Sequence, residues 1–284
     1  MEKIKKIKYL IFGDGYLGNK LNDFLDHSII SKVHIKSVDD VKKEIIKYNP
    51  EFVINSIGKV GKPNVDWCET HKSETLFANV IVPALMVEAC QELNKKMVHL
   101  GTGCIYSGDN NSKGFSEEDE PNFDGSFYSR SKQMAEKILK EFNVLQIRLR
   151  MPVDSIPNKR NLITKILKFD KIINIPNSVT IIDDFLIAAK KLMDKSVTGI
   201  FNVVNQGPET HKELLDIYNE YSPVKKKFEL IPEKELKNIT LARRSNCVLS
   251  TKKLESLGIH LTETKRALKE CVKKHVEFEE KKKK

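Results

Sequence analysis

Near its amino terminus the chain reads Tyr9-Leu10-Ile11-Phe12-Gly13-Asp14-Gly15-Tyr16-Leu17-Gly18. Four apolar residues followed by glycines in the spacing G-x-G-x-x-G predict a buried strand, a tight turn and the start of a helix. A turn of this kind lets the backbone approach a pyrophosphate at the N-terminus of the helix. We therefore expect a dinucleotide to bind along residues 13–18, with a plain tight turn as the alternative reading.

Apolar runs and amphipathic stretches alternate beyond this turn. Strands are expected at residues 33–35, 52–55, 97–100, 145–149 and 199–204, and helices at about 39–48, 73–93, 129–142, 181–193 and 210–221 and from 262 onward. Pro83 must kink or restart the second of these helices. The alternation predicts an α/β protein with a doubly wound parallel sheet of the Rossmann type.

The alternation becomes irregular after Arg150, where prolines follow at positions 152, 157 and 176. We therefore expect a nucleotide-binding Rossmann domain at 1–150 plus about 178–205. A smaller, C-terminal substrate lobe is expected at about 151–177 plus 206–276. Residues 277–284 are predicted to form a disordered tail.

Composition narrows the class of protein. The 284 residues carry 49 Lys and Arg against 39 Asp and Glu and are 40% hydrophobic, which excludes disorder of the whole chain. No long apolar run or signal-peptide core is visible, so neither a membrane span nor export is expected. The positive charge is interleaved with acidic residues and lacks a recognition motif, so nucleic-acid binding is not expected. Five dispersed cysteines, without metal-ligand spacing, favour a reducing cytoplasm and no metal site.

Residues after the second and third predicted strands bear on the cofactor. The second strand would end in Ile35-Lys36-Ser37, and a cation with a hydroxyl suits a ribose 2′-phosphate. NADPH is therefore the expected cofactor, although Asp39 keeps NADH possible. Asn55 and Gly58 follow the third strand, where such residues line a cofactor, although any turn selects them too.

A second motif supplies acid-base chemistry. Tyr128 and Lys132 lie four residues apart at the start of a predicted helix, hence on one face of it. An ammonium group close to a phenol stabilises the phenolate and makes the phenol a useful acid near neutral pH. Together with Thr102, which directly follows the fourth strand, the pair can protonate a carbonyl oxygen as hydride arrives.

The glycine turn, Thr102 and Tyr-x-x-x-Lys together resemble the extended short-chain dehydrogenase/reductases. Longer matches, from about Tyr9 to Leu257, resemble the nucleotide-rhamnose synthases (epimerase/reductases), which are similar to dTDP-4-dehydrorhamnose reductase. The matching segments are Gly61–Glu69, Thr102–Tyr106, Pro121–Ser129, Arg148–Pro152, Asn161–Lys165 and Asn174–Ser178. Gly101 departs from the many relatives that carry Ser there, so Thr102 has no neighbouring hydroxyl.

The resemblance implies a bifunctional 3,5-epimerase/4-reductase that converts UDP-4-keto-6-deoxy-D-glucose to UDP-L-rhamnose with NADPH. The choice of UDP over dTDP or GDP as the nucleotide rests on the resemblance alone. It implies that Tyr128 is the acid, that Lys132 tunes it and holds the cofactor, and that Thr102 binds the same oxygen. Cys104 and Lys165 match the epimerase pair of the family. Substrate contacts are expected from Met151, Asn161, Lys165 and Arg243.

Two alternatives stay open. One is a pure 4-reductase of an already epimerised, dTDP-type sugar, against which Cys104 argues. The other is a non-catalytic, NADP-binding regulatory subunit, against which the intact Tyr128 and Lys132 argue. A nucleotide sugar is the expected partner, and a homodimer is the common state of soluble enzymes.

Overall fold

The computed structural model describes residues 6–236 and 238–282. Its contacts divide the chain into two compact units. The first unit comprises the described residues up to Ile105, with Phe123–Arg148 and Ala189–Phe201. The second comprises Tyr106–Asn122, Leu149–Ala188 and the described residues from Asn202 on.

A six-stranded sheet is the framework of the first unit. Its spatial order is β2-β1-β3-β4-β5-β9, formed by β1 (Tyr9–Phe12), β2 (Ser28–Ser31), β3 (Phe52–Asn55), β4 (Lys96–Thr102), β5 (Val144–Leu149) and β9 (Gly199–Asn202). β1 pairs in parallel with both β2 and β3, and β3 pairs in parallel with β4. This parallel sheet with flanking helices confirms the predicted α/β fold of the Rossmann type.

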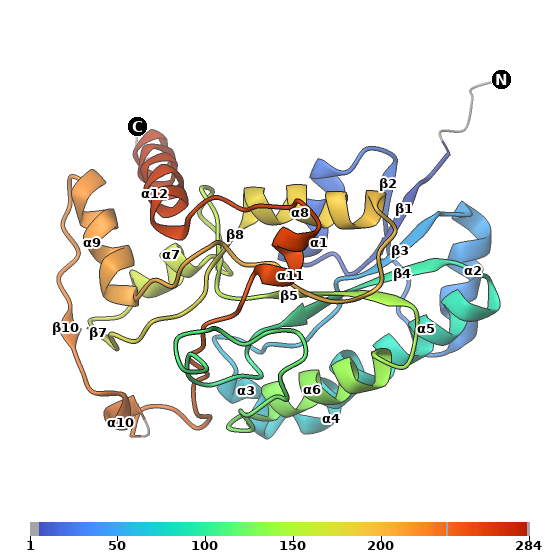
Figure 1. Cartoon of the computed structure of the whole chain (residues 1–284), viewed down its shortest axis with the longest axis horizontal. Coiled ribbons are helices and arrows are strands. Elements are labelled where there is room, and N and C mark those ends of the chain that lie inside the picture. Colours follow the sequence, from blue (N-terminus) through green and yellow to red (C-terminus); the bar gives the residue numbers. More distant parts are fainter. Residues whose placement is uncertain (1–5, 237, 283–284) are drawn as a thin grey trace. The chain divides into compact units, whose positions relative to one another are not determined.

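Helices cover both faces of this sheet. They are α1 (Tyr16–Phe24), α2 (Val38–Tyr48), α3 (Asp66–Thr70), α4 (Lys72–Leu76), the π-helix η1 (Phe77–Ile81), α5 (Val82–Glu92) and α6 (Phe127–Leu139). Figure 1 shows α2, α5 and α6 on one face and α1 on the other. The core between sheet and helices includes Leu10, Val53 and Met86, all fully buried. Burying each such side chain stabilises the fold by about 1.5–3 kcal/mol.

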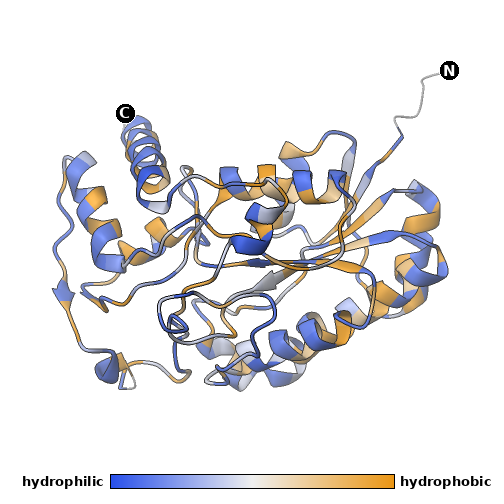
Figure 2. Ribbon diagram, in the orientation of Figure 1, coloured by the Kyte–Doolittle hydropathy of each residue, from blue (hydrophilic) through white to orange (hydrophobic). Residues whose placement is uncertain are grey.

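The predicted break at Pro83 takes the form of a π-helical turn. α4, η1 and α5 form one continuous helix, Lys72–Glu92, with Pro83 in the first turn of α5. Proline cannot donate to the preceding turn, and the wider π-turn accommodates it. This helix is long and apolar enough to cross a membrane, but 56% of its most apolar window is buried inside the protein, so it is weak evidence for a membrane span. Figure 2 shows α5 largely in the apolar colour.

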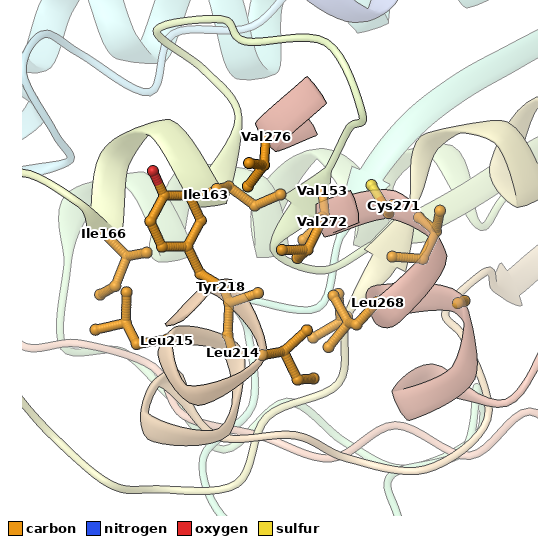
Figure 3. Packing of buried hydrophobic residues seen from close by; sticks show 14 of the residues in the cluster. Val153, Ile163, Ile166, Leu214, Leu215, Tyr218, Leu268, Cys271, Val272 and Val276 are labelled. Atoms are coloured by element: carbon orange, nitrogen blue, oxygen red, sulfur yellow. The ribbon is translucent and has the colours of Figure 1, made fainter. Parts of the chain in front are cut away.

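The second unit is built from short strands and helices. They are β6 (Pro152–Val153), β7 (Lys171–Ile172), β8 (Thr180–Ile181), β10 (Glu229–Leu230), α7 (Leu162–Ile166), α8 (Ile182–Asp194, which continues into the first unit), α9 (His211–Tyr221), α10 (Glu233–Leu236), α11 (Lys252–Ser256) and α12 (Thr264–Lys281). Its core packs α9 against α12 (Figure 3). The predicted capping box opens α9, with Thr210 and Glu213 each accepting from the other's backbone N–H.

Two boundaries differ from the predicted ones. Residues 106–122, 149–150, 178–188 and 202–205 belong to the second unit, although they were predicted in the first. The disordered tail predicted from 277 is wrong as far as Lys281, because α12 continues to that residue. Glu279 accepts a hydrogen bond from the Tyr218 hydroxyl at 3.0 Å, which ties this last part of α12 to α9. Residues 283–284 of that tail lie outside the described residues.

The predicted second strand is also wrong. The strand is Ser28–Ser31, whereas Val33, His34 and Ile35 form the loop that follows it. Val33 and Ile35 carry the β-branched, apolar signature of a strand, but Ile35 is buried in the core beside α2 without pairing to β1. Serines at both ends of β2 weaken its apolar signal.

Candidate active site

The glycine turn after β1 is closed by contacts that allow no side chain. Gly13 has φ +107°, and a Cβ on Gly18 would lie 2.0 Å from the carbonyl oxygen of Gly13. The Ser56 hydroxyl lies 2.9 Å from the carbonyl oxygens of both Phe12 and Gly13, which fixes the end of β1 to the segment after β3. Glycine at 13 and 18 is therefore a steric requirement of this turn.

Gly15 differs from its two neighbours because a Cβ there would meet nothing within 4 Å. It is the N-cap of α1, and within the described chain no side chain caps that helix. The Asn19 amide donates to the carbonyls of Asp14 and Gly15, at 2.6 and 2.8 Å, and so holds the turn around this space. Helix N–H groups facing an open cradle fit a pyrophosphate, so the dinucleotide site predicted at residues 13–18 is sterically sound.

The predicted 2′-phosphate residues, Lys36 and Ser37, lie at the start of α2 and do not directly follow a strand. Because β2 ends at Ser31, the residue that directly follows the strand is Lys32, not Lys36. Ser37 is the N-cap of α2, and its backbone N–H and that of Lys36 both donate to the Asp40 carboxylate. These bonds hold the pKa of Asp40 below its ordinary value. Lys32 was not considered in the sequence analysis because the strand was misplaced, and the cofactor contacts of Lys36 and Ser37 stay predictions.

The segment after β3 is tied to α6 by a residue that the sequence analysis did not single out. Asn79, buried in η1, accepts from the backbone N–H of Lys59 at 2.7 Å and donates to its carbonyl at 3.0 Å. It also donates to the Ser131 hydroxyl at 2.9 Å. Gly58, a predicted cofactor residue, lies in this segment. Asn55 is 0% exposed, so the structure contradicts a direct cofactor contact by its side chain.

Thr102 and Cys104 lie at the carboxyl end of β4 and are fixed to each other. The backbone N–H of Cys104 donates to Thr102 Oγ1 at 3.1 Å, so this bond leaves the hydroxyl hydrogen of Thr102 available as a donor. The Ser129 hydroxyl donates to the Cys104 carbonyl at 2.6 Å. Ser129 in turn is part of the N-cap of α6, with its backbone N–H bound to Ser126.

α6 carries the predicted acid-base pair in its first two turns. Tyr128 and Lys132 are both buried, one helical turn apart. Lys132 Nζ is 3.0 Å from the Leu100 carbonyl, to which it donates, and 3.0 Å from His99 Nε2. Burial lowers the pKa of Lys132 to about 8, against the opposing effect of Glu136. Burial, together with the nearby Lys132, lowers the pKa of His99 well below its ordinary value, so its imidazole is neutral.

All of these groups follow the carboxyl ends of neighbouring parallel strands. Ligands of open α/β sheets bind at that edge. There the first unit presents a glycine turn that fits a pyrophosphate, a hydroxyl at Thr102, a thiol at Cys104 and a phenol at Tyr128 beside Lys132. This set can protonate an oxygen at a carbon that receives hydride, and can remove a proton from a carbon next to it.

The predicted substrate residues all belong to the second unit. Met151 adopts φ +42°, which is strained for a residue with a side chain. Lys165 lies in α7, and Arg243 is exposed. Asn161 does not fit its predicted role, because it is 0% exposed. It caps α7 through Ile163 N–H and donates to the carbonyls of Asp154 and Ile156, so we assign it to holding the helix that carries Lys165.

Comparisons with known proteins identify the family of the chain. The sequence model of the RmlD substrate binding domain matches residues 8–277. A bifunctional dTDP-4-dehydrorhamnose 3,5-epimerase/dTDP-4-dehydrorhamnose reductase of Arabidopsis thaliana is 35% identical over 272 residues, 92% of this chain and 90% of that protein.

Two further relatives extend the comparison. A trifunctional UDP-glucose 4,6-dehydratase/UDP-4-keto-6-deoxy-D-glucose 3,5-epimerase/UDP-4-keto-L-rhamnose-reductase of the same plant is 37% identical over 92% of this chain, which spans 41% of that protein. The crystal structure of a UDP-rhamnose synthase from Acanthamoeba polyphaga mimivirus superposes with a TM-score of 0.90. It is 32% identical and covers 94% of this chain and 99% of its own.

Proposed function

Because the chain belongs to the RmlD substrate binding domain family, we propose that it is a bifunctional 3,5-epimerase/4-reductase that makes UDP-L-rhamnose from UDP-4-keto-6-deoxy-D-glucose with NADPH. The observation that carries the proposal is the fixed pairing of Cys104 with Thr102, next to the start of α6. It adds a thiol to the hydroxyl and the phenol that a reductase needs. In the described part of the chain, none of the five cysteines forms a disulfide, which suits a reducing cytoplasm, where we expect the enzyme to act.

The reduction step uses the groups of the first unit. When bound, NADPH supplies the hydride that goes to carbon 4 of the sugar. Tyr128 gives its phenolic proton to the oxygen on that carbon, and the Thr102 hydroxyl donates a hydrogen bond to the same oxygen. In its ammonium form, Lys132 favours the phenolate that results.

Epimerisation precedes reduction because it needs the ketone. The protons on carbons 3 and 5 are acidic because the carbanion left by their removal delocalises onto the oxygen of the neighbouring ketone, where hydrogen-bond donors stabilise it. The Cys104 thiolate removes such a proton from one face of the sugar. Lys165 returns a proton to the opposite face, which inverts the carbon. Arg243 pairs with the diphosphate of the substrate.

The test measures the oxidation of NADPH and the incorporation of deuterium from the solvent separately. The protein is mixed with NADPH and UDP-4-keto-6-deoxyglucose in D₂O, the loss of reduced cofactor is recorded, and the product is identified by NMR. We expect UDP-L-rhamnose that carries deuterium at carbons 3 and 5. Tyr128→Phe should abolish NADPH oxidation. Cys104→Ala should remove deuterium incorporation and leave the fold intact.

Cys90→Ala is the matched control for the thiol. Cys90 is buried in the core of the first unit, and burial raises its pKa to about 12, so it cannot act as a base. The control should retain both activities. Unchanged deuterium incorporation in Cys104→Ala would refute the epimerase assignment, and an unepimerised 6-deoxy sugar from the wild type would leave only the 4-reductase.

A further inference from the structure

A chain of four hydrogen bonds runs from the loop after β3 through His99 to Lys132 of α6, and from there to the Leu100 carbonyl. The backbone N–H of Ile57 donates to Asn55 Oδ1 at 3.0 Å, and Asn55 Nδ2 lies 3.1 Å from His99 Nδ1. His99 Nε2 lies 3.0 Å from Lys132 Nζ, which donates to the Leu100 carbonyl. His99 is 1% exposed, so neither ring nitrogen faces bulk water.

The first bond fixes the direction of the second. A backbone N–H is always a donor, so the atom of Asn55 that faces Ile57 must be the amide oxygen. The NH₂ group then faces His99 and donates to Nδ1. A neutral imidazole carries one hydrogen, and since Nδ1 accepts, that hydrogen resides on Nε2. His99 therefore donates to Lys132 Nζ, which can accept only as a neutral amine with a lone pair.

The ammonium form of Lys132 would break one of the hydrogen bonds made by Asn55. If Lys132 is an ammonium that donates to Nε2, the imidazole hydrogen moves to Nδ1 and confronts the NH₂ group of Asn55. Turning the Asn55 amide would remove that conflict but would place its NH₂ group against the N–H of Ile57. A buried donor without an acceptor is costly, so the ammonium state is disfavoured at His99 in either arrangement.

We propose that Asn55 and His99 set the protonation state of Lys132, because they hold the imidazole as the Nε2–H tautomer, which donates to Nζ and favours the amine. His99 is thus a positioning residue that acts through Lys132 on Tyr128. The effect of His99 on catalysis rests on the proposed reductase function. The tautomer of His99 does not depend on that function.

The charges around Lys132 do not impose the ammonium. Glu136, one turn along α6, raises its pKa, but that carboxylate is shared with Arg148 of β5. Glu69 of α3 is engaged with Arg130 and the backbone N–H of Phe127. The pKa of Lys132, about 8, leaves both of its forms accessible near physiological pH.

Imidazole tautomers are read directly by ¹⁵N NMR. In uniformly labelled protein without cofactor or substrate, His99 is assigned by the loss of its signals in His99→Gln. At pH 9, where Lys132 is the neutral amine because its pKa is about 8, we expect a protonated Nε2 and an unprotonated Nδ1. A protonated Nδ1 would overturn the proposal, and this result would leave the proposed enzymatic function untouched.

The pH dependence of NADPH oxidation is the second readout. Asn55→Asp replaces the donor to Nδ1 with an acceptor, so the imidazole should turn its hydrogen to Nδ1 and accept from an ammonium at Lys132. His99→Gln offers an amide oxygen at the Nε2 position and adds no charge, so it controls for the carboxylate introduced by the other variant. Either change should move the alkaline loss of kcat/KM, expected near pH 8 in the wild type, upward by about one unit or more. An alkaline limb that stays in place in His99→Gln, with activity otherwise retained, would contradict the proposal.

Discussion

Replacing Glu136 by Gln should lower the free energy of unfolding by about 3–5 kcal/mol. Glu136 receives two hydrogen bonds of 2.7 Å from the Arg148 guanidinium, one at each carboxylate oxygen. The Arg148 side chain is 1% exposed, so its charge has lost its hydration and depends on this carboxylate. Gln keeps the volume of Glu136 but removes the countercharge and one of the two acceptors. The melting temperature should fall by roughly 6–20 °C, at about 2–4 °C per kcal/mol.

Urea unfolding measures the loss, with the fluorescence of Trp67, the single tryptophan, as the signal. Asp194→Asn is the matched control. It breaks the Lys190–Asp194 pair on α8, whose side chains are 45% and 39% exposed, and should cost less than about 1 kcal/mol. If Glu136→Gln loses no more stability than this control, the carboxylate is not what offsets the burial of Arg148, and the reasoning fails.

Three further outcomes are expected. Asn161→Ala should destabilise the second unit by about 2–4 kcal/mol in urea unfolding, because the buried amide caps α7 and satisfies two carbonyls. Gly18→Ala should lower both the free energy of unfolding and the affinity for NADPH, since its Cβ would lie 2.0 Å from the Gly13 oxygen. Gly15→Ala places its Cβ in open space, so it should lower NADPH affinity in calorimetry and leave the free energy of unfolding unchanged. Lys132 has a pKa of about 8 in the folded protein against an ordinary 10.5, so the unfolded chain binds the extra proton between these values. The free energy of unfolding should therefore rise with pH across that window, by up to about 3 kcal/mol relative to Lys132→Met.

Local patterns predicted those elements that short-range chemistry determines. The strand Phe52–Asn55 is found with its predicted bounds, because it begins with three apolar residues, two of them β-branched, between the turn-forming residues Pro50 and Gly58. The capping box at Thr210 is equally local, since its donors and acceptors lie within four residues. The glycine turn is local only in part: Gly18 is required by the Gly13 carbonyl oxygen within the turn, whereas a Cβ on Gly13 would meet Ser56 and Ile57, which follow β3.

Elements that depend on distant partners were less predictable. β2 is a strand because Ser28–Ser31 pairs with β1, and no apolar alternation within those four residues marks it. Ile35 has the better strand signature but is used to fill the core beside α2. The misplaced strand directed attention to Lys36 and left Lys32, which directly follows β2, unconsidered as a contact for the ribose phosphate.

The same distinction applies to the acid-base pair. The four-residue spacing correctly put Tyr128 and Lys132 on adjacent turns of one helix, and a lysine at that spacing was expected to act as a fixed cation. The charge of a lysine, however, is set by what surrounds Nζ, and His99 enters that environment from β4, 33 positions away in the sequence. Nothing in the spacing of α6 encodes the direction in which Asn55 orients the imidazole. Helical periodicity can therefore identify the residues of such a site, whereas their protonation states follow only from contacts between strands.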